Sequence, residues 1–169
     1  MRKIIAAILV VLIAAAGWWY ASPIWTLHAM RDAVKDHDAA RLSAYVDYPA
    51  LREDLKADLG RYVMSEAAKR SGDAGSKFGA VIATAFLGPI VDAAVSPEGV
   101  EAMLAVENRK DSQAPRPVPA SAGDDPVIDR DALDSFRVHG KDPSKGALVF
   151  HRSGLGWKLV GVDLPASDR

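Results

Sequence analysis

The chain has 169 residues, of which 49% are apolar and 25% are charged, so it has room for one modest hydrophobic core and an appendage. Its 21 basic and 22 acidic side chains nearly cancel, which leaves no bulk electrostatic reason to expect a nucleic-acid partner. It contains no cysteine, and this excludes disulfides, cysteine-ligated zinc, iron–sulfur clusters, thiol catalysis and a lipoprotein cysteine.

The N-terminal segment, MRKIIAAILVVLIAAAGWWYA, has the pattern of a membrane anchor. Arg2 and Lys3 precede an uncharged run at residues 4–21, which as a helix would span roughly 27 Å, close to the roughly 30 Å of a bilayer core. The run ends in two tryptophans and a tyrosine, residue types that favour the membrane interface. We therefore expect residues 1–21 to form a transmembrane helix that contacts the membrane through residues 4–21.

The same residues predict how this segment is oriented and processed. Basic residues before an apolar run stay in the cytoplasm, which predicts a single pass with the N-terminus in the cytoplasm and the C-terminal domain on the other side of the membrane. Ala14 and Ala16 form an A-x-A site, where cleavage would remove residues 1–16. Cleavage there would take the aromatic residues 18–20 away from the interface, and the apolar run exceeds the roughly 7 to 15 residues of a signal peptide. An uncleaved anchor therefore fits the sequence better than a cleaved, secreted form.

Residues 22–107 are expected to form the helical part of the domain. The Ser-Pro pair at residues 22–23 predicts the start of one amphipathic helix, and Asp38 predicts the start of a short second helix. Pro49 is expected to end the second helix, because it disfavours helical geometry at Tyr48, and to open a third helix. The sequence thus predicts a helix-turn-helix corner around this proline.

A nearly uncharged stretch follows at residues 78–95. It predicts a buried helix that is kinked at Gly88 and Pro89. A second transmembrane pass is also possible by length, but Pro89, Asp92 and the many alanines and glycines disfavour it. A second Ser-Pro pair at residues 96–97 predicts the start of another helix.

The C-terminal third begins with a change of composition. Residues 108–126 hold four prolines and no aromatic residue, which predicts a mobile loop that proteases cut first. Residues 127–165 contain SFRVHG, ALVFHR and WKLVGVDLP, which predict a meander of about three antiparallel strands. The last segment is apolar on both faces and is therefore expected to be central or doubly covered. The expected fold class is α+β, with about four to five helices packed on this small sheet behind the transmembrane helix.

Two stretches of the chain resemble the bacterial domain-of-unknown-function family 2939. One is the D-x-x-x-L-x-x-x-V-D-Y-P-A-L-R-x-x-L run from Asp38 to Leu55, and the other is F-x-R-x-G-x-x-W-K-L-x-x-x-x-L-P from Phe150 to Pro165. The resemblance implies a single-pass or exported envelope protein without an assigned reaction, and it carries over no catalytic residue. The order of helices and strands is also similar to the cone-shaped folds of the nuclear-transport-factor-like kind, in which helices pack over a curved antiparallel sheet.

Common catalytic and nucleotide-binding motifs are absent from the sequence, including H-E-x-x-H, Walker A, G-x-G-x-x-G and G-x-S-x-G. His139 and His151 lie on neighbouring expected strands and could suggest a metal site. A turn near Pro143 would place His139 opposite Ala147, roughly 13 Å from His151 at about 3.3 Å per residue, which is too far for a shared metal. We therefore expect neither a metal nor a cofactor.

Four residues are candidates for a pocket: Tyr45, Tyr48, Asp92 and Trp157. Asp92 is the one charge in its apolar stretch and could serve as a general base in a cavity, although an outward-facing or ion-paired carboxylate is the commoner arrangement. Our first hypothesis is a periplasm-facing membrane-anchored module with a binding or interaction role in the cell envelope, no catalytic residue, and an envelope protein or a small apolar ligand as partner. The alternative is a small-ligand-binding or enzymatic cone-shaped domain with Asp92 as acid or base.

Overall fold

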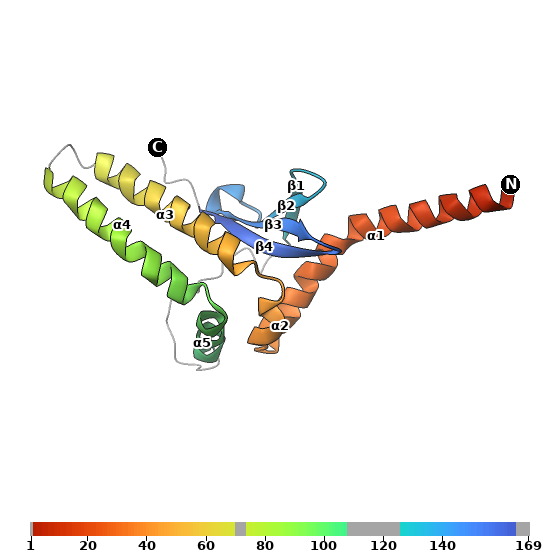
Figure 1. The fold of residues 1–169 in the computed structure, drawn as a ribbon, viewed down its shortest axis with the longest axis horizontal. Helices are drawn as coiled ribbons and strands as arrows, with labels where there is room; N and C mark the ends of the chain where they lie inside the picture. The colour runs from red at the N-terminus through yellow and green to blue at the C-terminus, as the bar shows by residue number, and fades with distance from the viewer. Residues whose placement is uncertain (1, 70–73, 108–125, 165–169) are drawn as a thin grey trace.

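The computed structural model describes residues 2–69, 74–107 and 126–164, and the chain within these ranges forms an α+β fold (Figure 1). The expected loop at residues 108–126 lies outside them except for its last residue. The elements in chain order are α1 (Arg2–Lys35), α2 (Ala39–Ser43), α3 (Tyr48–Lys69), α4 (Ala74–Ala94), α5 (Pro97–Glu107), β1 (Val127–Arg130), β2 (Ser135–His139), the 3-10 turn η2 (Pro143–Lys145), β3 (Ala147–Ser153) and β4 (Gly156–Asp163). The expected α+β class is thus confirmed.

Helix α1 is continuous through Pro23, so the prediction that a new helix starts at Ser22 is wrong. Proline lacks the N–H that would bond the carbonyl of Trp19, four residues earlier. The Ser22 hydroxyl donates a hydrogen bond to that carbonyl at 3.1 Å instead. Because the orphaned acceptor finds this donor one residue away, the helix continues, and the apolar N-terminal half and the domain share one 34-residue helix.

The corner after α1 forms largely where the sequence predicts it. The carboxylate of Asp38 accepts a hydrogen bond from the Arg41 N–H and caps α2, as expected. Helix α3, however, begins at Tyr48 rather than at Pro49, because the first turn needs no N–H from the proline and Asp47 caps it. The Asp47 carboxylate accepts from the Ala50 N–H at 3.3 Å.

Helix α4 differs from its prediction in burial. It continues through Gly88 and Pro89, and its large apolar residues Val81, Phe86 and Ile90 are exposed, so it is not a buried helix. The reason is its position, because α3 and α4 form a hairpin that projects away from the sheet (Figure 1). Helix α5 follows at a 74° bend, and its start is capped as expected by Ser96, whose hydroxyl accepts from the Gly99 N–H.

The sheet has four antiparallel strands in the order β1-β2-β3-β4, one more than the sequence predicts. The missed strand is β1, whose VIDR segment is short and half polar and pairs Ile128 with Val138. The register of the next pair is the predicted one, since His139 lies opposite Ala147. The two histidines therefore lie at different positions along the sheet, as the turn at Pro143 requires.

Strand β4 is an edge strand by pairing order, so of the two expected arrangements, central or doubly covered, the central one is wrong. Helices α1 and α3 both contact it. Its free edge is nevertheless occupied: the Leu159 N–H donates to the Tyr45 carbonyl, and the Asp47 N–H donates to the Leu159 carbonyl. A β-bulge lies between β3 and β4, where Val149 pairs with Gly161 and the next residue of β3 pairs with Leu159. The bulge shifts the alternation of side chains by one, so the apolar residues of β4 before and after it share a face.

The hydrophobic core lies between this face of the sheet and the C-terminal half of α1. Phe136 and Phe150 are fully buried and stack at 4.8 Å between ring centroids. Trp157 meets Phe136 edge-on, also at 4.8 Å. Leu27 and Met30 of α1 cover these rings, so the helix that carries the apolar N-terminus also completes the core.

Candidate functional site

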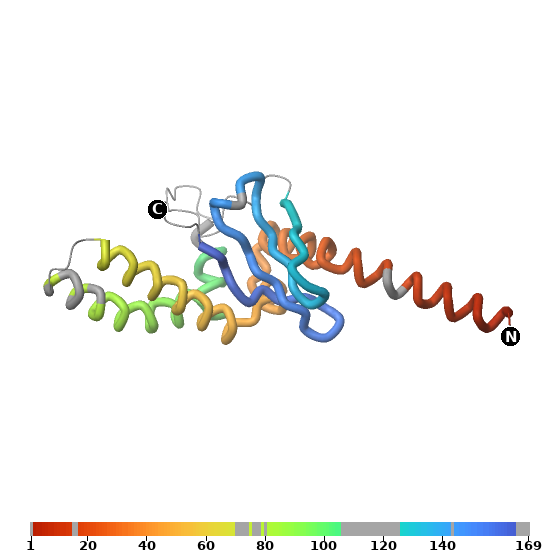
Figure 2. Tube along the Cα trace, turned by 90° about the horizontal axis from the view of Figure 1, so that it is seen from above, coloured from red at the N-terminus to blue at the C-terminus, as the bar shows by residue number. Residues whose placement is uncertain are grey.

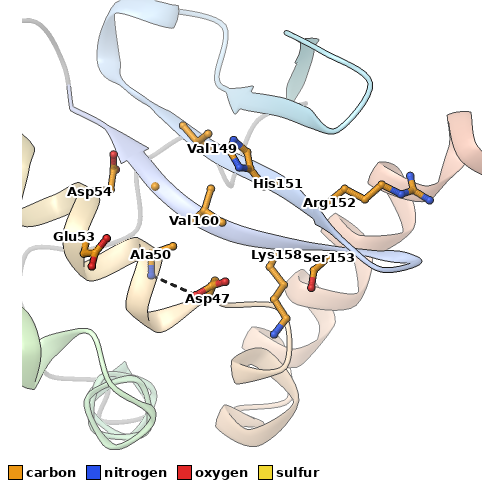
Figure 3. A pocket seen from close by; sticks show the side chains of 11 residues that line it. Asp47, Ala50, Glu53, Asp54, Val149, His151, Arg152, Ser153, Lys158 and Val160 are labelled. Carbon is orange, nitrogen blue, oxygen red and sulfur yellow. Dashed lines mark hydrogen bonds between the residues drawn. The ribbon is translucent and has the colours of Figure 1, made fainter.

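An open groove lies between the start of α3 and the outer face of β3 and β4, with a volume of about 580 Å³ (Figure 3). Its lining residues come from two segments that are about a hundred residues apart in sequence. They are Asp47, Ala50, Glu53, Asp54, Val149, His151, Arg152, Ser153, Lys158, Val160 and Gly161. The groove therefore exists only where the helical part and the sheet meet.

Two of the groove carboxylates are committed to backbone groups. Asp47 accepts from the Ala50 N–H, as described above. Asp54 accepts from the Val162 N–H at 2.9 Å, which satisfies a donor on the free edge of β4. Gly161 lets the helix approach this closely, since a Cβ atom there would lie 2.5 Å from Oδ2 of Asp54. Asp47 thus caps the start of α3, and Asp54 holds α3 against the sheet.

The remaining charges of the groove have both signs. Glu53 on α3 is exposed, as is His151 on β3, and Lys158 on β4 is half-buried. None of the three side chains forms a hydrogen bond or ion pair within the described ranges. Arg152 points away from the groove toward α1 (Figure 3). Such a surface offers charged contacts to a polar ligand, but it does not assemble a nucleophile with a general base.

The four residues that the sequence singled out do not line this groove. Asp92 lies at the surface of α4 and forms a 2.6 Å ion pair with Lys56 of α3. Trp157 is buried with 2% exposure on the opposite face of the sheet. Tyr45 bonds to β4 through its backbone, and the Tyr48 hydroxyl lies 2.6 Å from the Ser43 hydroxyl. The tyrosines thus stabilise the corner between α2 and α3, and neither of them has a described contact with Asp92.

A second polar cluster lies at the start of the sheet. The ring of His139 is nearly buried, with Nε2 at 2.8 Å from the Asp129 carboxylate and Nδ1 at 2.6 Å from the Gly140 carbonyl. Both partners offer acceptor oxygens, so the protonated ring, which has a hydrogen on each nitrogen, satisfies both contacts at once. The hydrogen bond to Asp129, followed by the bond to the Gly140 carbonyl, raises the pKa of His139 above its ordinary value. Groups of three or more metal-ligating side chains are not found among the described residues.

The junction between the apolar part of α1 and the sheet is built from arginines and aromatic rings. The Arg152 guanidinium lies 3.3 Å from the Trp19 ring centroid and 5.2 Å from that of Trp157. The Arg130 guanidinium lies 4.4 Å from the Tyr20 ring centroid and donates to the Tyr20 carbonyl. These are cation–π distances, so two strands hold the helix by its aromatic segment.

These arginine contacts were not predicted from the sequence. Arg152 belongs to the F-x-R-x-G stretch. Two local signals hint at its contact with Trp19: a positive charge near the end of a strand, and a run of aromatic residues at the end of an apolar helix. The indole N–H of Trp157 donates to the Ser22 hydroxyl at 2.9 Å, across 135 positions of the chain. Contacts over such separations cannot be found from periodicity.

The fold and the junction define a class of protein, an α+β domain carried on a long apolar N-terminal helix. Helix α1 is long and apolar enough to cross a membrane. Residues 12–103 match the family described as Protein of unknown function (DUF2939), and because this match covers more than half of the chain, the protein belongs to that family. The family resemblance of the sequence is thus confirmed. No curated protein and no solved structure matches the chain.

Proposed function

We propose that the protein is a single-pass inner-membrane protein whose domain faces the periplasm and binds a partner in the cell envelope. One observation carries the membrane part of the proposal. The large apolar side chains between Ile4 and Ile13 are 54–65% exposed, and no described part of the chain covers them. Eight exposed apolar side chains on consecutive turns of one helix are unfavourable in water and suit the interior of a bilayer.

The orientation is supported by the charges at the two ends of this run. Arg2 and Lys3 precede it, which favours a cytoplasmic N-terminus, and the aromatic residues 18–20 follow it at the depth of the outer interface. Retention of the anchor is supported by its continuity with the domain, because α1 passes without a break from the apolar run into the core. A cleaved form remains the alternative outcome of the test below.

A binding role is favoured over catalysis by the state of the carboxylates. Asp47 and Asp54 accept hydrogen bonds from backbone N–H groups. Asp92, the acid or base of the alternative hypothesis, pairs with Lys56 at the surface and does not line the groove. The groove between α3 and β4 keeps its unpaired charges, including Glu53, for contacts with another molecule. Its charged lining suits a polar segment of an envelope protein better than a small apolar ligand.

The topology can be tested with reporters fused after Pro165. A reporter that works only outside the cytoplasm should be active, and one that works only in the cytoplasm should be silent. An immunoblot of the same fusions gives the mass of the product, which should include residues 1–16 and should sediment with membranes. Activity of the cytoplasmic reporter would reject the orientation, and a shortened, soluble product would show that the anchor is a cleaved signal.

A further inference from the structure

Two leucines lie in the turns of two of the three sheet hairpins and are the most exposed large apolar residues in the described parts of the chain. Leu133 lies in the turn from β1 to β2 and is 80% exposed, and Leu155 lies in the turn from β3 to β4 and is 84% exposed. Tight turns ordinarily carry glycine, asparagine, aspartate, serine or proline, because these types suit the backbone and water. A leucine at such a position stabilises the protein only if its side chain is transferred out of water.

Both turns lie at the same end of the sheet. In an antiparallel sheet of order β1-β2-β3-β4, the β1–β2 and β3–β4 connections share one end and η2 occupies the other. Figure 2 shows both turns on the side toward the N-terminal half of α1. The turns that contain Leu133 and Leu155 therefore lie at the end of the sheet that is nearer to the anchor.

The same end of the sheet is fastened to the aromatic segment of α1. Leu155 is three residues from Arg152, whose guanidinium stacks on Trp19, and Leu133 is three residues from Arg130, whose guanidinium stacks on Tyr20. Three residues reach at most about 11 Å. The leucine tips are thus tied closely to the residues expected at the membrane surface.

We propose that Leu133 and Leu155 insert into the interface of the bilayer that α1 crosses, so that the domain rests on the membrane at three points. This inference rests on the proposed membrane anchoring. Its chemistry is that of an interfacial contact, with two aliphatic tips at the depth of the acyl boundary and two arginines at the depth of the phosphates. The contact fixes the domain upright and keeps the groove between α3 and β4 at a constant height above the membrane.

The proposal can be tested with the full-length protein reconstituted into vesicles of phosphatidylethanolamine and phosphatidylglycerol. The chain has no cysteine, so single cysteines can carry an environment-sensitive fluorophore at chosen positions without removal of native thiols. Probes at L155C and L133C should lose most of their emission to a lipid-attached quencher and little to aqueous iodide. A probe at S144C, in the exposed 3-10 turn at the other end of the sheet, should show the reverse.

A probe at V10C in the anchor separates the two proposals. If the lipid-attached quencher quenches the V10C probe while iodide quenches both hairpin probes, the hairpin contact is overturned and the anchor stays supported. If the lipid-attached quencher does not quench the V10C probe, the anchoring itself is overturned. Because the fluorophore could itself favour lipid, a second set places it at S153C beside the turn. There, lipid quenching should be lost in the L133S/L155S background, and unchanged quenching would also overturn the hairpin contact.

Discussion

Trp157 connects the sheet to α1 through its ring and through its N–H. The ring packs edge-on against Phe136, and the N–H donates to Ser22. Replacement by alanine removes a fully packed aromatic residue and leaves a cavity at the core, which should cost about 3–5 kcal/mol in the free energy of unfolding. Denaturant unfolding of the full-length protein in detergent, followed by circular dichroism, measures this loss.

Lys158→Ala is the matched control for Trp157→Ala. Lys158 is the next residue of β4, lies on the groove face, and has no partner within the described ranges, so its loss should change the free energy of unfolding by no more than about 0.5 kcal/mol. Equal unfolding midpoints for the two variants would show that the indole adds nothing to the core. Trp157 would then be a contact for a ligand or partner.

His139 should make the stability of the domain depend on pH. Its pKa is raised in the folded protein by the Asp129 hydrogen bond, so the folded state holds the proton more tightly than the unfolded state. The sign follows from linkage: the added stability is fully present below the unfolded pKa of about 6.5 and is lost as the pH rises through the folded pKa. Unfolding experiments across this range should show a decrease in stability toward high pH.

Asp129→Asn tests the cause of this pH dependence. The amide removes the charged acceptor, so the pKa of His139, read from its imidazole NMR signals, should fall and the pH dependence should flatten. Asp131→Asn is the control, because Asp131 pairs with Arg137 instead. A His139 titration that is the same in Asp129→Asn as in the unmodified protein would contradict the assignment.

At the scale of elements, the free edge of β4 is closed by the segment that leads into α3. Backbone bonds between Leu159 and residues 45–47 close one part of the edge, and Asp54 closes the part after the bulge. Unpaired strand edges invite pairing with other chains, so this arrangement protects the sheet. It also explains the V-D-Y-P stretch in structural terms, since Val46 forms a parallel bridge with Leu159.

Asp54→Ala should destabilise the protein by about 1–3 kcal/mol, because the Val162 N–H would lose its acceptor in a partly buried place. Glu53→Ala, one residue earlier on α3, removes an exposed carboxylate without a described partner and should leave the unfolding midpoint unchanged. If both variants unfold alike, the Asp54 bond does not contribute to holding the edge.

Gly161→Ala probes the same contact from the strand. The new Cβ would meet the Asp54 carboxylate at 2.5 Å, and that carboxylate cannot move away without breaking its bond to Val162. The substitution should therefore be destabilising alone and should cost less in an Asp54→Ala background. A double-mutant cycle measures this coupling, and strictly additive free energies would exclude it.

At the scale of the whole molecule, α1 belongs to two environments. Its N-terminal half is apolar and exposed, and its C-terminal half covers the sheet and packs Leu27 and Met30 against the core (Figure 1). A chain that starts at Trp18 should therefore fold and unfold cooperatively, because it keeps every contact between α1 and the core. A chain that starts at Asp36 should not fold, because Phe136 and Phe150 would be uncovered.

Circular dichroism and denaturant unfolding of the two truncated chains check this prediction. Cooperative unfolding of the chain that starts at Asp36 would mean that the sheet and the remaining helices form a core without α1. Loss of folding in the chain that starts at Trp18 would mean instead that the apolar N-terminal half is needed for the domain, and not only for the membrane.

The sequence by itself determined the features that depend on neighbouring residues. The apolar run, the helix starts at Asp38 and Ser96, and the pairing of His139 with Ala147 follow from local hydrophobicity, capping and turn chemistry. These signals are complete within a few residues, and the α+β class follows from their order. They left β1 unseen, because a strand of four residues with two charges has almost no pattern of its own.

Only the tertiary structure decided the features that join distant segments. Continuity of α1 past Pro23, the edge position of β4, the groove beside Asp54 and the stacking of Arg152 on Trp19 each depend on contacts between parts of the chain that the sequence separates. The physical reason is that burial and hydrogen-bond satisfaction are properties of the folded whole. A proline within a helix, the free edge of a strand or a partly buried arginine is tolerated when another part of the chain supplies the missing hydrogen bond or contact.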